Sequence, residues 1–295
     1  MLKFEQHLTL PADDLKLIEV LNLACSEHSL SNGQIKAAIN KGALWLTRGK
    51  YTQRIRKLKK ALKTDDTLHF YYDENVLNQQ PAQAKLIADC HDYSVWYKPY
   101  GMLSQGSKWS DHCTIARWAE TQLMPQRSAF IVHRLDRAAS GLIIIAHSKK
   151  MAQAFSQIFE HHQLEKHYQI IVHGELISDS DTTKDKVVLT DIDGKSAKST
   201  FQSVETNTLN DLSLLAVKIE TGRKHQIRKH AASIGLPVVG DRLHGNNKMV
   251  LPDEINLQLC AVKLAFNCPV TKQEQSFTLP NELKPNLKHL AALLQ

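Results

Sequence analysis

The pattern of hydrophobic and polar positions divides the chain into two regions of mixed helix and strand. In the first region, apolar residues at helical spacing predict helices over 17–24 and 35–39, and β-prone runs predict strands over 43–46 and 67–72. Ser31, with Gln34 three residues later, has the form of a capping box and indicates the start of the second helix. A polar stretch over 76–85 follows. We interpret it as a linker between an N-terminal domain over 1–75 and a larger domain over 86–295.

The second region is rich in predicted strands. The strands are expected over 86–90, 95–97, 129–132, 142–146, 168–172, 197–205 and 212–220. Helices are expected over 114–123, 151–159 and 225–234 and at the C-terminal end, and 258–266 is helical or extended. Strands in runs with helices between them are typical of an α+β domain.

A dense polar segment lies between two of these apolar runs. Four charged or ionisable side chains occur within residues 133–137, between the predicted strands over 129–132 and 142–146. One carboxylate, Asp136, lies between two arginines, Arg134 and Arg137. A neighbouring cation favours the ionised form of an acid, so Asp136 is a candidate nucleophile or base. A structural ion pair explains the same local pattern equally well.

Composition adds a preference for a polyanionic partner. The 295 residues carry a formal net charge of +7, and 42% of them are hydrophobic, as is typical of a globular protein. This charge favours a nucleic acid as partner, although an ordinary soluble surface also explains it. The five cysteines are scattered, which indicates reduced thiols and a cytoplasmic location. No apolar stretch predicts a signal peptide or a membrane span.

A basic run connects the last two strands of the N-terminal region. No acidic residue occurs between Arg48 and Asp65, and the cations are carried by an expected amphipathic helix over 51–63. Helices, strand, basic connection and final strand resemble the small αL RNA-binding module of a ribosomal small-subunit protein and of tyrosyl-tRNA synthetase. The resemblance implies RNA contacts by cations of this run. The candidates are Arg48, Arg54, Lys57 and Lys60.

Four stretches of the second region resemble the RluA-type family of RNA pseudouridine synthases. The central signature is His-Arg-Leu-Asp at 133–136 with Ser-Gly at 140–141, and Lys-Pro-Tyr-Gly precedes it at 98–101. Lys-His-Tyr follows at 166–168. The last motif is Thr-Gly-Arg-Lys-His-Gln-Ile-Arg from 221, followed by Gly-Leu-Pro-Val-Val-Gly-Asp from 235. The four motifs occur in the family's order and extend over the chain from residue 86 onward.

The resemblance implies a fold and an activity. The fold is a bent, mostly antiparallel sheet with flanking helices and a central basic cleft, and a small α/β RNA-binding module precedes it. The activity is the isomerisation of uridine to pseudouridine in RNA, with the target base flipped out of its stack. It implies no cofactor and no metal. We expect RNA as the partner, with rRNA favoured over tRNA because of the N-terminal module, no membrane association, and a monomer.

The resemblance also implies roles for individual residues. Asp136 is the catalytic aspartate, acting on the sugar as a nucleophile or through a glycal route, Arg228 is the cation beside it, and Tyr168 stacks on the uracil. Arg134 occupies the space left by the flipped base. The further expected substrate or RNA contacts are His133, Arg137, Lys98, Arg223, His225 and Gln226, with Lys98 and Arg223 as phosphate contacts.

Two other functions are compatible with parts of this pattern. A non-catalytic RNA-binding or ribosome-assembly protein could retain the same fold, but it would be free to lose the set of Asp136, Tyr168 and Arg228. A metal-dependent hydrolase would use histidines such as His161, His162 and His167. No carboxylate completes a ligand triad with them at a familiar spacing.

Overall fold

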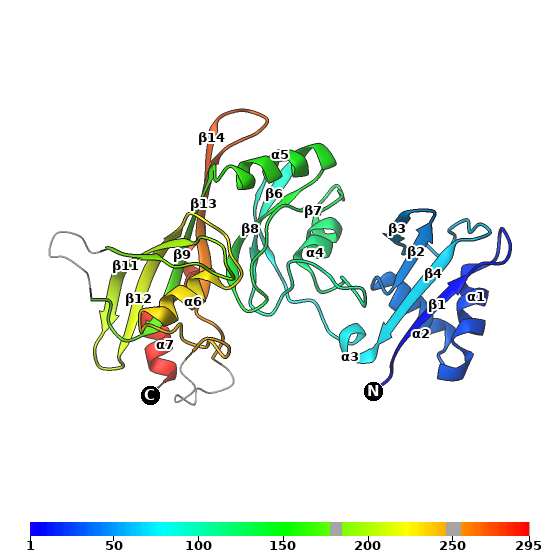
Figure 1. Cartoon of the computed structure of the whole chain (residues 1–295), viewed down its shortest axis with the longest axis horizontal. Coiled ribbons are helices and arrows are strands. Elements are labelled where there is room, and N and C mark those ends of the chain that lie inside the picture. The colour runs from blue at the N-terminus through cyan, green and yellow to red at the C-terminus, as the bar shows by residue number, and fades with distance from the viewer. Residues whose placement is uncertain (178–184, 246–254, 295) are drawn as a thin grey trace. The chain divides into compact units, whose positions relative to one another are not determined.

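The computed structural model describes residues 1–177, 185–245 and 255–294 (Figure 1). The chain forms two compact units. The first consists of Met1–Ala82 with Gln105–Trp118, and the second of Gln83–Ser104 with Ala119–Gln295. The segment from Gln105 to Trp118 therefore belongs to the N-terminal unit, whereas the sequence pattern places it in the larger domain.

The first unit is a four-stranded antiparallel sheet with helices packed on it. The strands are β1 (Lys3–Thr9), β2 (Leu44–Arg48), β3 (Tyr51–Arg54) and β4 (Thr67–Asp73), in the order β1-β4-β2-β3. The helices are α1 (Leu17–Ala24), α2 (Asn32–Asn40) and the short α3 (Glu74–Leu77), with a 3₁₀ turn at Ser26–His28. Apolar residues of α1 and α2 share one buried core with Leu44, Leu68 and Phe70 of the sheet. The Ser31–Gln34 capping box at the start of α2 is present, as expected.

Two local expectations for this unit were wrong. Residues 51–54 form β3, which pairs with β2 from Tyr51↔Arg48 to Arg54↔Trp45, so the expected helix over 51–63 does not form. Its apolar residues Ile55 and Leu62 nevertheless lie in the core. The pattern also missed β1, whose residues alternate strictly between exposed and half-buried along β4.

The second unit is built on a ten-stranded sheet. Its main path is β10-β11-β12-β9-β13-β8-β6-β5, with β7 added to β8 and β14 added to β13. The strands are β5 (Lys85–Asp89), β6 (Tyr93–Lys98), β7 (Phe130–Ile131), β8 (Ser140–Ala146), β9 (Leu164–His173), β10 (Asp185–Leu189), β11 (Lys198–Asn207), β12 (Leu212–Ile219), β13 (Leu259–Asn267) and β14 (Glu274–Thr278). The helices are α4 (Ile115–Gln122), α5 (Lys149–Glu160), α6 (Gln226–Ser233) and α7 (Leu287–Leu293), with a 3₁₀ turn at Asn281–Leu283. Helix α4 begins in the first unit and ends in the second.

The sheet joins two antiparallel halves through one short contact. Among the strand pairs in the described ranges, β8–β13 is parallel and the others are antiparallel, and it consists of Cys260↔Ser140 and Ala261↔Gly141. A side chain at Gly141 would overlap the backbone of Ala261, because an added Cβ would lie 2.3 Å from its nitrogen and its oxygen. Glycine thus allows the two halves to approach closely at this point.

Helices cover parts of this sheet and form its two main cores. Phe155 and Ile158 of α5 pack with residues of β6, β8 and β13, and Leu287 and Leu290 of α7 pack with residues of β9 and β12. The predicted α+β class with a mostly antiparallel sheet and flanking helices is confirmed. The stretch over 258–266, helical or extended from its pattern, is strand β13. No helix in the described part of the chain is long and apolar enough to cross a bilayer.

Candidate active site

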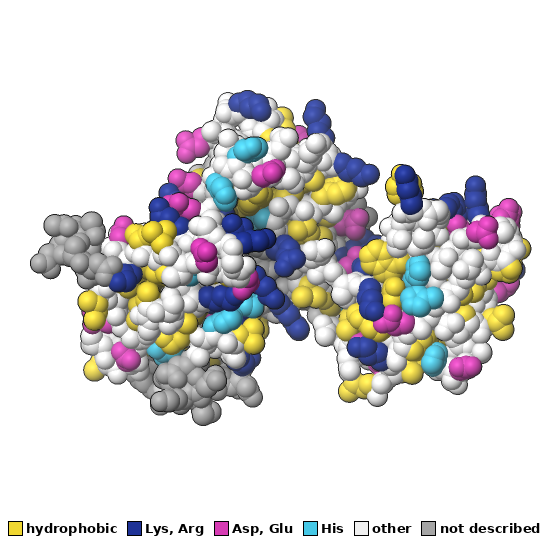
Figure 2. Space-filling view, viewed as in Figure 1, with side chains coloured by type: hydrophobic (Ala, Val, Ile, Leu, Met, Phe, Trp, Pro, Cys, Tyr) yellow, Lys and Arg dark blue, Asp and Glu magenta, His cyan; other side chains and the backbone are white. Residues whose placement is uncertain are grey.

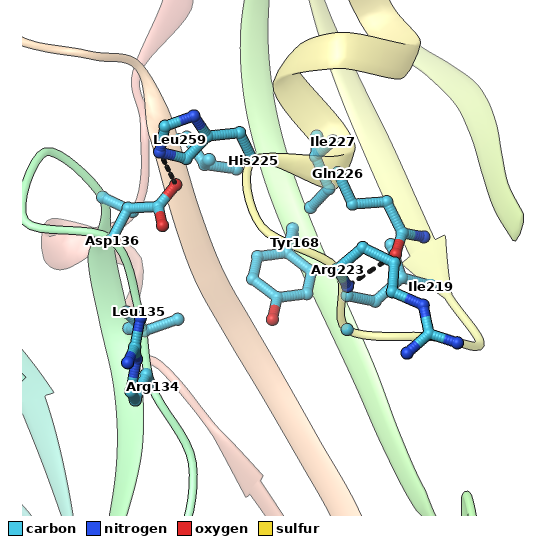
Figure 3. Close-up of a pocket in the computed structure, with 12 residues that line it drawn as sticks. Arg134, Leu135, Asp136, Tyr168, Ile219, Arg223, His225, Gln226, Ile227 and Leu259 are labelled. Atoms are coloured by element: carbon cyan, nitrogen blue, oxygen red, sulfur yellow. Dashed lines mark hydrogen bonds and ion pairs between the residues drawn. The ribbon is translucent and has the colours of Figure 1, made fainter. Parts of the chain in front are cut away.

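A pocket lies where the loop between β7 and β8 meets β9, β13 and the turn from β12 into α6 (Figure 3). The sequence motifs at 133–141, 166–168 and 221–228 all contribute to it. Its lining consists of Arg134, Leu135, Asp136, Ala139, Tyr168, Ile219, Gly222, Arg223, His225, Gln226, Ile227 and Leu259. Segments far apart in the sequence are therefore brought together around one polar cavity.

Asp136 presents its carboxylate to this pocket beside two nitrogen-bearing side chains. Its Oδ2 lies 3.6 Å from Nη1 of Arg228 and 3.8 Å from Nε2 of His225. The side chain of Asp136 is 29% exposed, so it is open to a ligand. In both contacts the shortest distance runs to Oδ2 of the carboxylate.

Arg228 is held rigidly by a second carboxylate. Its Nε donates to Oδ2 of Asp241 at 2.7 Å, and its Nη2 donates to Oδ1 of the same residue. Burial lowers the pKa of Arg228, but the hydrogen bonds and charge of Asp241 outweigh it and the pKa is raised. Asp241 also accepts from the backbone N–H groups of Leu243 and His244, so its own pKa is lowered in spite of burial. Paired hydrogen bonds of this type fix the position of a guanidinium.

Tyr168 forms the wall of the pocket opposite Asp136. It lies in β9 between Val217 of β12 and Ala261 of β13, and it is 9% exposed. Figure 3 shows its ring edge and hydroxyl turned into the cavity between Asp136 and Arg223. Burial, and to a smaller extent the charge of Asp136, raises the pKa of the phenol. Tyr168 is therefore a neutral ring with a hydroxyl at neutral pH, suited to stacking on a base and to hydrogen bonding.

Lys98 holds the loop that carries Asp136, and its expected contact with RNA was wrong. Its side chain is completely buried, and Nζ donates to the carbonyls of Pro99, Met102 and Ala139 at 3.1, 2.9 and 2.6 Å. Burial lowers its pKa to about 7. A lysine enclosed by three carbonyl groups cannot reach a phosphate, so it ties the segment after residue 98 to the loop that carries Asp136.

Two further contacts join the same two segments. Ser104 Oγ donates to the carbonyl of Leu135 at 2.7 Å and accepts from its N–H at 3.1 Å. The N–H of Gly101 donates to the carbonyl of Arg137 at 2.8 Å. The backbone on both sides of Asp136 is therefore fixed, which positions the carboxylate. Sequence reasoning assigned no role to Ser104, and its position near the Lys-Pro-Tyr-Gly motif is the signal that could have indicated one.

His133 supports the loop as a neutral ring. Its Nε2 accepts from the N–H of Ile144 at 2.9 Å, and the ring stacks on Phe159 with centroids 4.8 Å apart. Burial, together with the charge of Lys166, lowers the pKa of His133 to about 3. This ring is committed to the backbone of β8, so its expected substrate contact is replaced by a structural one.

Gln226 was also assigned wrongly to RNA contact. Its amide oxygen accepts from Thr221 Oγ1 and from the N–H of Arg223, and its amide nitrogen donates to Lys198 O and Ser199 Oγ. All its hydrogen-bonding capacity is used inside the protein. His225, directly before it, has a positive φ of 57° and begins helix α6, and this backbone conformation places its ring beside Asp136.

Of the remaining expected contacts, Arg134 and Arg223 line the pocket, and Arg137 follows Asp136 in the same loop. Arg134 and Arg137 are exposed, and Arg137 Nε donates to the carbonyl of Gly101 at 3.2 Å. Arg223 is half-buried, and its Nε donates to the carbonyl of Ser196 at 3.1 Å. These three guanidinium groups keep free N–H groups that could contact an RNA strand.

In the first unit, two of the four expected RNA contacts are engaged within the protein. Arg48 donates through Nε and Nη2 to Asp66 at 2.7 and 2.6 Å. The side chain of Arg54 is 10% exposed, pairs with Asp111 at 2.7 Å and lies over Trp45. Arg54 is therefore a structural residue, and Arg48 keeps only its outer face for a ligand. Lys57 is exposed and Lys60 half-buried.

The histidines that suggested a metal site have other contacts. His161 Nδ1 lies 2.8 Å from the carbonyl of Gln157, and His167 Nε2 lies 3.2 Å from Oε2 of Glu165. Throughout the described ranges, no three His, Cys, Asp or Glu side chains gather in a way that could hold a metal ion.

Comparison with known proteins agrees with this geometry. A family model described as RNA pseudouridylate synthase matches residues 92–233. An uncharacterized RNA pseudouridine synthase of Aquifex aeolicus is 26% identical over 251 residues, which cover 79% of this chain and 78% of that protein. A solved structure, the human RNA pseudouridylate synthase domain containing 1, aligns with a TM-score of 0.58 at 18% identity and covers 73% of this chain and 97% of its own.

Relatives named tRNA pseudouridine synthase C are also similar. The one from Pectobacterium carotovorum is 33% identical over 168 residues, and the match covers 49% of this chain and 45% of that protein. The chain therefore spans less than half the length of that relative. The one from Vibrio cholerae is 30% identical over 200 residues, and the match covers 60% of this chain and 82% of that protein. Because the similarity extends over most of the Vibrio relative, the chain belongs to the RNA pseudouridylate synthase family.

Proposed function

We propose that this RNA pseudouridine synthase isomerises a uridine of tRNA, with Asp136 as the nucleophile. The observation that carries the proposal is the carboxylate of Asp136, open to the pocket and 3.6 Å from the fixed guanidinium of Arg228. The names of several relatives favour tRNA as the substrate. The sequence of the N-terminal unit by itself favours rRNA.

The first step breaks the glycosidic bond. A carboxylate oxygen of Asp136 attacks C1′ of the ribose. The bond between C1′ and N1 breaks, and its electron pair leaves with the uracil. Arg228 and His225 lie beside the carboxylate at 3.6 and 3.8 Å, and their position helps to aim it at C1′.

The second step joins the same base through carbon. The detached uracil turns until C5 faces C1′, a C5–C1′ bond forms, and the ester bond to Asp136 breaks. C5 loses its proton and N1 gains one, so atoms and charge balance without any redox change. The flat, neutral ring of Tyr168 keeps the uracil in the pocket during the turn, because stacking tolerates rotation in the plane of the base.

The target nucleotide must leave its stack to reach this pocket. Unstacking costs a few kcal/mol. Arg134 is exposed and lines the pocket, and its planar guanidinium can fill the space that the base vacates and stack on its neighbours. The exposed Lys57 and the half-buried Lys60 of the first unit add sequence-independent attraction to the phosphate backbone.

The test is tritium release from RNA labelled at uracil C5. Labelled tRNA and rRNA are purified separately from a strain that lacks this protein, and wild type is compared with Asp136→Asn. Asp92→Asn, an exposed acid of the same unit, is the matched control. We expect release from the tRNA fraction by wild type and Asp92→Asn alone. Release from rRNA alone would contradict the substrate, and equal release by Asp136→Asn would contradict the role of the carboxylate.

A further inference from the structure

A larger groove continues from the pocket across the second unit. It shares Arg134, Asp136, Tyr168, Ile219, Gly222 and Arg223 with the pocket and adds Val132, His133, Phe159, Glu160, His162, Lys166 and Lys224. Four lysines or arginines line it, against two carboxylates, of which one is the nucleophile of the proposed reaction. Figure 2 shows Lys and Arg side chains gathered in a band across this face of the second unit.

Lys166 occupies a distinctive place in this groove. It precedes Tyr168 by two residues in β9, so both side chains point to the same face of the sheet, with Cα atoms roughly 7 Å apart. That spacing is close to one nucleotide step along an extended RNA strand. A phosphate next to a uridine held on Tyr168 would therefore lie within reach of the Lys166 ammonium.

The charge of Lys166 has no partner in the described ranges of the chain. Its side chain is half-buried, and burial alone lowers its pKa, with no carboxylate opposing the effect. The same charge contributes to lowering the pKa of His133. A partly buried cation without an opposite charge costs stability, so its presence is explained better by a ligand than by the fold.

Gly222 leaves the ammonium of Lys166 open to the groove. A Cβ added to Gly222 would lie 3.8 Å from Nζ of Lys166, so this position lies directly beside the ammonium. The backbone of Gly222 is not in the left-handed region, so its conformation does not require glycine. Glycine at this position leaves Nζ of Lys166 accessible to a ligand in the groove.

From these contacts we infer that Lys166 binds a phosphate of the RNA strand directly beside the flipped uridine. Lys224 and Arg223, on the other side of Gly222, extend the same phosphate-binding surface. The inference rests on the proposed function for the identity of the ligand. Lys166 is a positioning residue in this account, because it fixes the strand and leaves the bond changes to Asp136.

The first test measures binding of unmodified bulk tRNA to the full chain as a function of salt. Lys166→Met removes the charge, and Lys166→Arg retains it. The matched control is Lys218→Met, because Lys218 lies on the neighbouring strand opposite His167, on the other face of the sheet, and pairs with Glu165 at 3.2 Å. We expect Lys166→Met to weaken binding roughly tenfold and to reduce the salt slope by about 0.7 to 1. Lys166→Arg and Lys218→Met should stay near wild type.

Stability separates this role from a structural one. Lys166→Met should unfold at the same temperature as wild type or higher, because it removes an unpaired, partly buried charge. KM should rise with the dissociation constant while kcat changes little. An unchanged salt slope and affinity would overturn the inference, and so would a lower unfolding temperature with a parallel loss of all RNA binding.

The second test locates the phosphate. A short synthetic RNA stem-loop with uridines in its loop carries one uncharged methylphosphonate linkage at a time. For wild type, one or two linkages should weaken binding, and for Lys166→Met these same linkages should have no further effect. Independent, additive losses would overturn the inference. Since binding needs no turnover, a failure of the proposed isomerisation would show in tritium release and leave this result readable.

Discussion

Asp241 fixes the guanidinium of Arg228 through Nε and Nη2, which leaves Nη1 to face Asp136. Both side chains of the pair are almost completely buried. Nη1 then lies 3.6 Å from Asp136, so the position of the cation beside this carboxylate is set by a second carboxylate, which does not itself line the pocket. The two acids have different tasks: one is proposed to react and the other holds the cation.

The pair predicts that Asp241→Asn is costly in two ways. An asparagine can accept from the backbone N–H groups of Leu243 and His244, but it removes the charge that binds Arg228 most closely and leaves the buried guanidinium only Asp136, at 3.6 Å, as an opposite charge among the described residues. We expect the free energy of unfolding to fall by about 3 kcal/mol and kcat to fall while tRNA binding is largely kept. Chemical denaturation and tritium release measure the two effects. Asp193→Asn, which removes an exposed partner of Lys229 on the same helix, should change neither.

The same variant has a defined dependence on pH. The pKa of Asp241 lies below 3.8 in the folded chain, so the group stabilises the fold above its unfolded pKa, and this stabilisation is lost as the pH falls through the folded value. The difference in stability between wild type and Asp241→Asn should therefore be constant near neutral pH and shrink in acid below 3.8. A difference that grows in acid would contradict the assignment.

Lys98→Met should damage the loop that carries Asp136 without removing a contact to RNA. The substitution leaves the carbonyls of Pro99, Met102 and Ala139 without their donor, and we expect a loss of about 2 kcal/mol in stability. Activity should fall with it. The salt slope of tRNA binding should stay at the wild-type value, whereas loss of a phosphate contact would reduce it by about 1. Lys85→Met, an exposed lysine in β5, is the control.

The low pKa of His133 predicts that the free energy of unfolding falls in acid. Its pKa is lowered to about 3 by burial, so between that value and 6.5 the unfolded chain binds a proton that the folded chain does not. Wild type should therefore lose up to about 1.4 kcal/mol per pH unit from this group as the pH falls below 6.5. In His133→Asn, whose side-chain oxygen can accept from the N–H of Ile144, this contribution should be absent. Identical acid profiles for the two proteins would show that His133 is not a buried neutral ring.

The basic run of the first unit should separate into binding and structural residues. Replacing Lys57 and Lys60 together by Met should weaken tRNA binding and lower its salt slope by about 1 to 2, with no change in unfolding. Arg54→Ala should instead lower the unfolding temperature, because it leaves Asp111 short of a partner and uncovers Trp45. Lys284 and Lys288 changed together to Met control for the loss of two charges.

Motifs with local turn chemistry could be assigned from the sequence, and the structure shows why. Asp136, Tyr168 and Arg228 were expected in one site, and the structure brings all three together. Each lies in a short motif beside a strand or at a helix start, so the neighbouring residues of the same motif form the local structure that positions its side chain. Asp241 stood in the same motif as Arg228, but a linear pattern does not show which of two carboxylates a guanidinium will bind.

Burial explains most of the wrong assignments. Lys98 and Gln226 are polar and lie within motifs, so both were expected to face RNA, but each makes its hydrogen bonds to groups inside the protein. Tyr51–Arg54 has an amphipathic pattern together with the residues after it, and pairing with β2 makes it a strand. Contacts with other segments decide these cases, and periodicity within one segment does not contain them.

The close contact between Gly141 and Ala261 joins the two halves of the sheet and also affects the distance between Asp136 and Tyr168. Asp136 belongs to the loop that enters β8, on one half of the sheet, whereas Tyr168 belongs to β9, which pairs with β13 on the other half. The distance between Asp136 and Tyr168, across the proposed position of the nucleotide, therefore depends on how closely the two backbones approach each other at Gly141, which has no side chain. An extra methyl group at Gly141 would push β8 and β13 apart. The distance between Asp136, the proposed nucleophile, and a base held on Tyr168 would then increase.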